Sequence, residues 1–159
     1  MRLLTIAVGT LAWLLAAAPS AYASDADCDV YEIEASDDAG GIDKGLDAKL
    51  GKVLKKAPFT SWKSFKLLKK HTKPVDENKP VSFDLTTAGK LTLNLKGVEA
   101  KPGKKKRLRI QATMHGKDGK QQLETTSSVD SGDAWLIGGE PLPAKPKSTY
   151  FVGIACTAK

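Results

Sequence analysis

Apolar and polar residues alternate along several stretches of this chain, most clearly between residues 107 and 139. Every second position from Leu108 to Met114 is apolar, which is the period of a strand with one wet face. Residues 116–119 and 130–133 combine glycine with aspartate and predict two tight turns. The pattern therefore predicts an antiparallel meander of three strands that ends at Gly138 and Gly139.

The same alternation predicts strands on both sides of this meander. They are expected within residues 29–34, 59–73, 81–86, 91–96 and 148–156. The last of them is apolar on both faces, which predicts a central position in a sheet. Prolines 141, 143 and 146 predict an extended crossing that cannot join a sheet ladder.

Residues 42–56 carry the one helical period. Leu46, Leu50, Val53 and Leu54 share one face, Asp43 can cap the start, and Pro58 ends the helix. We expect this stripe to pack on a sheet; the alternative is that the lysine-rich face lies on an anionic membrane. Together the elements predict a mainly β fold. We expect an antiparallel β-sandwich or partly open barrel of seven to eight strands, with one short helix after the first strand.

The N-terminus predicts export. Arg2 precedes an uncharged apolar run, and Ala21-Tyr22-Ala23 forms a small-x-small cleavage pattern, so residues 1–23 are expected to be a signal peptide cleaved after Ala23. The run is too short for the alternative, a membrane anchor. Residues 24–159 are then a single secreted or periplasmic β-rich domain, with no transmembrane segment after cleavage.

Two cysteines, Cys28 and Cys156, remain in the mature chain. In an oxidising compartment an even pair predicts one disulfide, with free thiols or an intermolecular bridge as the alternatives. An internal bond would hold the first and last strands side by side or face to face, and would contribute about 4 to 5 kcal/mol in the chain-entropy model.

The chain is basic, with a formal net charge of +7, of which only Arg2 is lost with the signal peptide. Nearly all of this charge is lysine, which suits diffuse attraction better than specific phosphate recognition. Two clusters are candidate anion-binding sites, and the alternative is that they are solvated surface or a repulsive strand edge. The first comprises Lys101, Lys104, Lys105, Lys106, Arg107 and Arg109, and the second Lys63, Lys66, Lys69 and Lys70.

Aromatic residues alternate with the second cluster, at Phe59, Trp62 and Phe65. Such interleaving can stack nucleic-acid bases. Packing within a strand is the favoured interpretation, and export argues further against a nucleic-acid partner.

No motif for catalysis is recognisable. His71 and His115 are the two histidines, and neither adjoins a nucleophile motif. The carboxylates of Glu32, Glu34, Asp84, Glu99 and Glu124 are expected to solvate wet strand faces. Gly138 and Gly139 lack the helix start and lysine of a phosphate loop. We therefore expect no enzyme, no cofactor and no metal site.

Residues 125–139, TTSSVDSGDAWLIGG, resemble a short pattern in the core of bacterial secretins, where a strand, a glycine turn, a second strand and Gly-Gly follow in this order. The long pore-forming part of secretins is missing, so the resemblance does not imply a channel. The mature chain also resembles small secreted bacterial proteins of undetermined function.

The sequence thus predicts a non-enzymatic exported binding or structural module of the bacterial cell envelope. It would be an accessory of an envelope or secretion assembly that uses a strand edge or sheet face against a protein. The alternative is a basic module that binds anionic polymers or surfaces, namely lipopolysaccharide, acidic glycan or anionic lipid.

Overall fold

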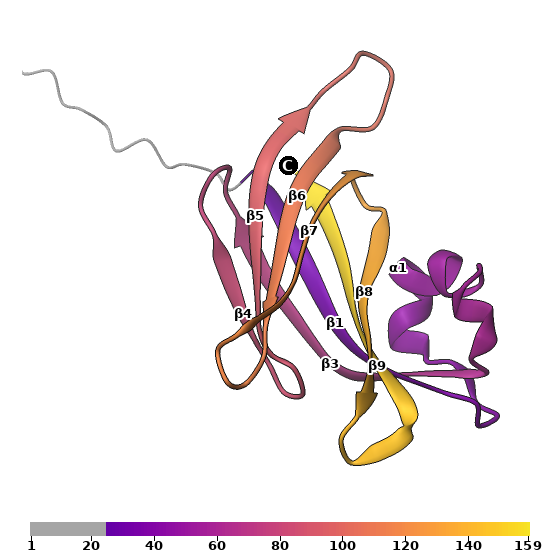
Figure 1. The fold of residues 1–159 in the computed structure, drawn as a ribbon. Helices are drawn as coiled ribbons and strands as arrows, with labels where there is room; N and C mark the ends of the chain where they lie inside the picture. The colour runs from indigo at the N-terminus through magenta and orange to yellow at the C-terminus, as the bar shows by residue number, and fades with distance from the viewer. Residues whose placement is uncertain (1–24) are drawn as a thin grey trace, which may run out of the picture.

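The computed structural model describes residues 25–159, in which two sheets face each other and a helix covers the outer face of one (Figure 1). Every strand pair in this part of the chain is antiparallel except the short parallel pair of β2 and β3. The predicted signal peptide, residues 1–23, lies outside the described residues. The elements are β1 (Ala26–Ser36), β2 (Gly41–Ile42), α1 (Lys44–Leu54), the 3-10 helix η1 (Phe59–Ser61), β3 (Ser64–Val75), β4 (Val81–Leu85), β5 (Gly89–Glu99), β6 (Arg107–His115), β7 (Gln121–Asp130), β8 (Ala134–Leu142) and β9 (Lys145–Ala158).

The larger sheet has the strand order β2-β3-β1-β9-β8, and the smaller has the order β4-β5-β6-β7. The predicted β-sandwich or partly open barrel is confirmed. Residues 25–159 hold nine strands rather than seven or eight, and the two-residue β2 is the shortest of them. The prediction that the last strand is central is also confirmed, because β9 lies between β1 and β8.

Two cores hold these layers together. Alternate residues of β1 and β9, such as Val30 and Ile154, meet Leu93 and Ile110 of the smaller sheet in the space between the sheets. The opposite faces of β1 and β9 pack against α1. β1 and β9 are therefore buried on both faces, which explains why residues 150–156 of β9 are apolar or glycine at consecutive positions.

The helix forms as its pattern predicts. The side chain of Asp43 accepts a hydrogen bond from the amide of Gly45 at 2.9 Å and caps the first turn. Leu46, Leu50 and Leu54 are almost fully buried against the larger sheet. The stripe thus packs on a sheet, and no helix within residues 25–159 is long and apolar enough to cross a membrane.

Two of the predicted connections are wrong. The meander does not continue into β8, because β8 pairs with β9 in the other sheet. At the turn before β8, the amide of Ser131 donates at 2.8 Å to the carbonyl of Lys106, the residue before β6 of the smaller sheet. The amide of Gly132 donates at 2.9 Å to the carbonyl of Cys156 in β9 of the larger sheet. This turn carries the chain from one sheet to the other.

The proline-rich segment is likewise not an unpaired crossing. β8 includes Pro141 and β9 includes Pro146, and the two strands form a hairpin in which Pro141 is the partner of Thr149. β8 is an edge strand, where a residue without an N–H can lie without breaking a ladder bond.

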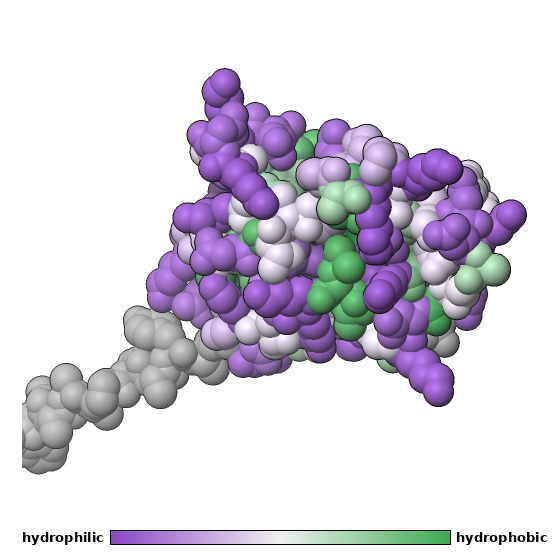
Figure 2. All heavy atoms as spheres, turned by 90° about the horizontal axis from the view of Figure 1, so that it is seen from below, coloured by the Kyte–Doolittle hydropathy of each residue, from purple (hydrophilic) through white to green (hydrophobic). Residues whose placement is uncertain are grey.

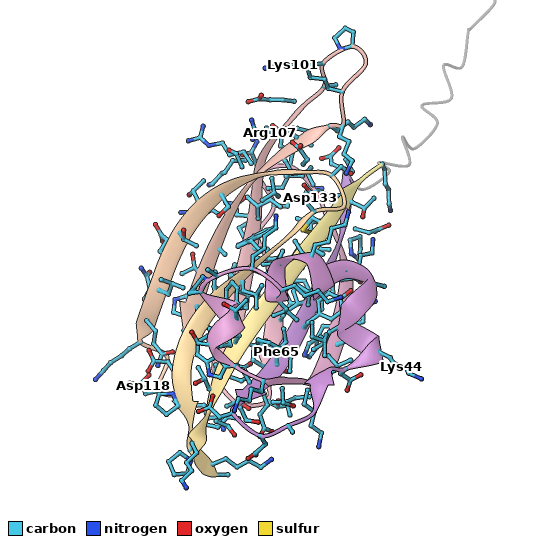
Figure 3. All side chains as sticks on the ribbon, turned by 90° about the vertical axis from the view of Figure 1, so that its right-hand side faces the viewer. Lys44, Phe65, Lys101, Arg107, Asp118 and Asp133 are labelled. Atoms are coloured by element: carbon cyan, nitrogen blue, oxygen red, sulfur yellow. A yellow bond between two sulfur atoms is a disulfide. The ribbon has the colours of Figure 1, made fainter. Side chains whose placement is uncertain are left out.

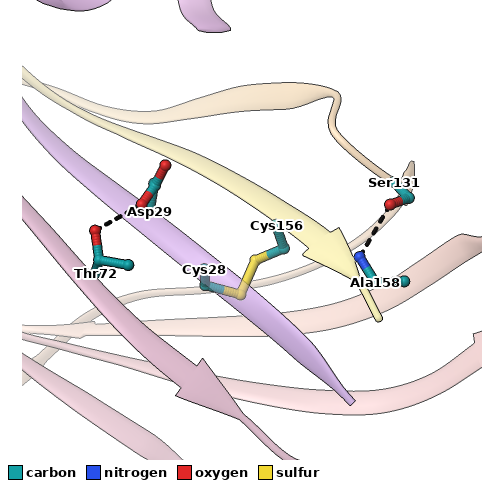
Figure 4. The surroundings of a disulfide bond; sticks show 6 residues. All are labelled: Cys28, Asp29, Thr72, Ser131, Cys156 and Ala158. Atoms are coloured by element: carbon teal, nitrogen blue, oxygen red, sulfur yellow. Dashed lines mark hydrogen bonds between the residues drawn. A yellow bond between two sulfur atoms is a disulfide. The ribbon is translucent and has the colours of Figure 1, made fainter. Parts of the chain in front are cut away.

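The disulfide between Cys28 and Cys156 is present and joins directly opposite residues of β1 and β9, with a Cα–Cα distance of 4.1 Å (Figure 4). Hydrogen bonds surround it, from Thr72 to Asp29 at 2.7 Å and from Ala158 to Ser131 at 2.9 Å. The first and last strands are therefore side by side, both by hydrogen bonding and by a covalent bond.

Candidate interaction site

The free edge of β7 is the longest unprotected strand edge among the described residues. β7 spans ten residues, Gln121–Asp130, and its one strand partner is β6. Its sequence, QQLETTSSVD, contains no proline, glycine, lysine or arginine, and it is rich in β-branched and small hydroxyl residues. A free edge of this kind presents unpaired backbone N–H and C=O groups to another chain.

The other edge strand of the smaller sheet is short and partly capped. β4 spans five residues, and the ammonium of Lys73 donates to its Ser82 carbonyl at 2.6 Å. Lys73 thus satisfies a backbone acceptor that an added strand would otherwise use.

The edges of the larger sheet carry the protective features of natural sheets. β3 presents Lys66, Lys69 and Lys70, and its register shifts opposite Glu32 and Ile33. β8 has register shifts at Gly138 and Pro141. Both Gly138 and Gly139 have positive φ, at 102° and 121°, which bends the strand away from a regular edge.

The side chains of β7 give its edge two different faces. Thr126 and Ser128 are exposed on the outer face of the sheet, whereas Thr125 and Ser127 are half-buried toward the space between the sheets.

The surface of the molecule is poor in large apolar side chains, since Leu68 is the one such residue that is exposed within residues 25–159. Figure 2 agrees for one end of the molecule, which is mostly hydrophilic with a small apolar patch.

The first predicted basic cluster lies at the Asp130 end of β7. The loop from β5 to β6, with the adjacent ends of β6 and β7, borders an open-sided cavity of about 390 Å³ (Figure 3 labels two of its residues, Lys101 and Arg107). Glu99, Lys101, Lys104, Lys105, Arg107 and Asp130 line it. The last residue of the free edge is therefore also part of the wall of this basic cavity.

Two of the four cations in the cavity are already paired. Arg107 lies 3.6 Å from Asp130, and Lys105 lies 3.4 Å from Asp133. Lys101 and Lys104 are exposed and have no ion pair with any described residue. The wall of the cavity thus carries four cations and two carboxylates, Glu99 and Asp130, and its net charge is positive.

The remaining members of the first cluster lie outside this cavity. Arg109 is exposed on the outer face of β6, opposite Ser128 of β7. Lys106 donates to the backbone carbonyl of Lys159 and so contacts the end of the chain.

The second cluster lies elsewhere. Lys63 bonds through its amide to the Ser36 carbonyl, at the end of β1 opposite the disulfide, and Lys66 is paired with Glu34 in the ladder. Lys69 and Lys70 of β3 lie opposite the middle of β1, and Lys70 forms an ion pair with Asp29 at 3.1 Å. The two basic clusters are in different sheets, so the structure does not bring them together.

The aromatic residues near the second cluster are used for packing. Phe59 and Trp62 meet Phe151 edge to face, with ring centroids 5.5 and 5.0 Å apart, beside the core under α1. Their faces are therefore engaged within the protein rather than arrayed along the lysines.

Glu32 and Glu34 are not on a wet face, contrary to expectation. Glu32 is 0% exposed and Glu34 is 9% exposed, because both point into the space between the sheets near its end. The Glu32 carboxylate accepts from the Thr86 amide at 2.9 Å, the Thr86 hydroxyl at 2.6 Å and the Tyr150 hydroxyl at 2.9 Å, and it lies 2.9 Å from Nε2 of His71.

This network ties both sheets together, since Glu32, His71 and Tyr150 belong to the larger sheet and Thr86 follows β4 of the smaller. Burial by itself raises the pKa of the Glu32 carboxyl. The hydrogen bonds from His71, Thr86 and Tyr150 outweigh burial and hold that pKa below its usual value. The carboxylate is therefore ionised and fully engaged by its own protein, as a structural group rather than a free acid.

The carboxylate of Glu34 is also engaged within the protein. It accepts hydrogen bonds from the Lys145 ammonium at 3.0 Å and the Ser148 hydroxyl at 2.9 Å.

His115 lines a shallow hollow of about 560 Å³ on the outer face of the smaller sheet, together with Asp84, Lys90 and Lys117. No group of three or more potential metal-ligating side chains occurs in the part of the chain that the structure describes.

Sequence patterns missed the buried carboxylates and the β7 edge for different reasons. Tyr31 and Ile33 alternate with Glu32 and Glu34, a pattern that predicts one wet face, and no local signal marks donors that lie 39 to 118 positions away. Whether β7 lies at an edge depends on the order of strands in the sheet, which the local pattern does not give. The one signal in the sequence is the absence of lysine and proline from residues 121–130.

No family model, curated protein or solved structure matches this chain.

Proposed function

We propose that the mature chain is a non-catalytic exported module of the bacterial cell envelope that binds a protein partner by strand addition at the edge of β7. In strand addition, an extended segment of the partner forms main-chain hydrogen bonds with an exposed strand. The observation that carries the proposal is the contrast between the edge strands. β7 is long and has no lysine, proline or register-breaking glycine, whereas β3 is lysine-rich, β4 is short and capped by Lys73, and β8 is bent by register shifts.

Export is supported by two independent features. The predicted signal peptide directs the chain out of the cytoplasm, and the Cys28–Cys156 bond is of the kind that persists in an oxidising compartment. The resemblance of residues 125–139 to a secretin segment includes the whole second half of β7, and it supports an accessory role in an envelope or secretion assembly.

The test is lysine-directed cross-linking in intact cells, comparing the native chain with the double variant T126K/S128K. Both positions are exposed on β7, and lysines on an edge repel an added strand. The control is T60K/S61K, which adds the same charge at exposed positions of η1. Mass spectrometry identifies the proteins that are captured.

We expect one reproducible partner with the native chain and the control, retained at high salt, and its loss with T126K/S128K. Capture of the same partner by T126K/S128K at undiminished yield would overturn the proposal. Release of the native chain from the envelope by salt, without a captured protein, would instead support the alternative of an anionic surface.

A further inference from the structure

The basic cavity at the Asp130 end of β7 contains a preformed turn that holds two lysines together. The amide of Lys104 donates to the Lys101 carbonyl at 3.1 Å, and Gly103 has a φ of 70°. Proline at the second position and a glycine with positive φ at the third fit a type II turn, whose end residues have Cα atoms less than about 7 Å apart. The backbone therefore brings the Cα atoms of Lys101 and Lys104 close together.

Neither of these two lysines forms an ion pair with a carboxylate among the described residues. Asp130 of the cavity wall is paired with Arg107 and the nearby Asp133 with Lys105, which leaves Glu99 as the one other carboxylate of the wall for two lysines. Both lysines line the same cavity, and its excess of positive charge attracts an anion from outside. A cavity of about 390 Å³ leaves room for side-chain carboxylates beside them.

The position of this site relative to β7 defines its ligand. Every strand pair in the smaller sheet is antiparallel, and an added strand that continues this pattern would begin beside Asp130 and end beside Gln121. Residues that precede the added strand would then reach the basic cavity. At the other end of β7, the residues beyond the strand would meet the β6–β7 turn with Asp118, whose carboxylate lies 3.8 Å from Lys120 (Figure 3).

We propose that the partner segment consists of an acidic stretch followed directly by a β-strand, and that Lys101 and Lys104 bind the carboxylates of that stretch. This inference rests on the proposed function, since it assigns the chemistry and the direction of the segment that adds to β7. The acidic stretch supplies charge complementarity and fixes the register, while the strand supplies the main-chain hydrogen bonds.

The test uses three synthetic peptides with the same alternating threonine–valine strand. One has four glutamates before the strand, one has four glutamates after it, and one has glycine and serine in place of the glutamates. Fluorescence anisotropy measures their affinity for the native chain, for K101E/K104E and for T126K/S128K. The control K117E/K120E makes the same charge change at exposed positions at the opposite end of β7.

We expect the peptide with leading glutamates to bind about tenfold more tightly than the uncharged peptide, as two exposed ion pairs allow. K101E/K104E should abolish this advantage, K117E/K120E should change it less than about twofold, and T126K/S128K should weaken all three peptides. Because all these positions are exposed, the variants are expected to fold, and circular dichroism verifies this.

Three results would overturn the inference, and they are distinguishable. Equal affinity for all peptides, with loss of binding in T126K/S128K, would refute the acidic stretch and leave the β7 site intact. Loss of glutamate-dependent binding in K101E/K104E but not in T126K/S128K would show that the cavity binds anions without the edge. Binding of no peptide, or binding indifferent to both variants, would refute the use of the β7 edge as well.

Discussion

The hydroxyl of Tyr150 donates a hydrogen bond of 2.9 Å to the carboxylate of Glu32, although 118 positions separate the two residues in the chain. Tyr150 is 2% exposed and Glu32 is 0% exposed, so no bulk water replaces this bond if it is lost. Burial, followed by the charge and hydrogen bond of Glu32, raises the pKa of the Tyr150 hydroxyl, which keeps it protonated as a donor.

Replacement of Tyr150 by phenylalanine tests this bond. We expect Y150F to lower the free energy of unfolding by about 1.5 to 3 kcal/mol, because a buried carboxylate loses one of its donors. Urea denaturation measures the change. The control is Y31F, whose hydroxyl donates at 3.2 Å to the partly exposed Asp29, and it should cost less than about 1 kcal/mol. Equal effects of the two variants would contradict the account.

The stability of the fold should fall in acid. The pKa values of Glu32 and Glu34 are lowered in the folded state below 4.5, so both carboxylates stabilise the fold above the pKa of the unfolded chain. This stability is lost as the pH falls from about 5 through the folded-state pKa values. Urea denaturation across this range measures the loss.

The variant E32Q isolates the contribution of Glu32. It should unfold more easily at neutral pH, by about 3 kcal/mol, because a neutral amide has one acceptor oxygen in place of two and lacks the charge that strengthens the bonds from Thr86 and Tyr150. Its stability should also vary less with pH in the acid range. The free energy of unfolding of E99Q, a change at an exposed position, should depend on pH as that of the native chain does. If the free energy of unfolding of the native chain does not change below about pH 5, the role of these carboxylates is contradicted.

Removal of the disulfide should destabilise the chain strongly. The bond closes a loop of 128 positions, and the variant C28A/C156A should lose about 2 to 5 kcal/mol of unfolding free energy. Guanidinium denaturation with and without a reducing agent measures this effect. The reducing agent should destabilise the native chain alone, because the sequence has two cysteines and the variant has none.

The contact between α1 and β9 depends on a small residue opposite a large one. A Cβ atom added at Gly153 would lie 2.9 Å from Cδ1 of Leu50 and 3.3 Å from Cδ1 of Ile33. We expect L50A to cost about 2 to 5 kcal/mol through the cavity that it creates, and G153A to cost about 1 kcal/mol through crowding.

The double variant L50A/G153A distinguishes packing from two separate effects. Without the Leu50 side chain, the methyl group at position 153 no longer meets it, so the double variant should be more stable than the sum of the single effects predicts. Thermal or urea unfolding of all four proteins gives the coupling energy. Strict additivity would show that Leu50 and Gly153 are not in direct contact.

Much of the local structure follows from the sequence alone. The alternation within residues 107–115, the stripe of Leu46, Leu50 and Leu54, and the pairing of Cys28 with Cys156 were all predicted and are all present. These features depend on the periods of strands and helices or on simple chemistry, so a few neighbouring residues specify them.

The tertiary structure decided the rest, because it depends on residues distant in the chain. Alternation places Glu32 and Ile33 on opposite faces of β1. The smaller sheet covers the Glu32 face and brings Thr86 to its carboxylate, and β9 of the larger sheet brings Tyr150. The turn at Ser131 and Gly132 sends β8 to the other sheet, and this separation leaves β7 with a free edge beside the basic cavity. The local pattern sets each strand, whereas its partners are set by long-range hydrogen bonds and packing that the local pattern does not encode.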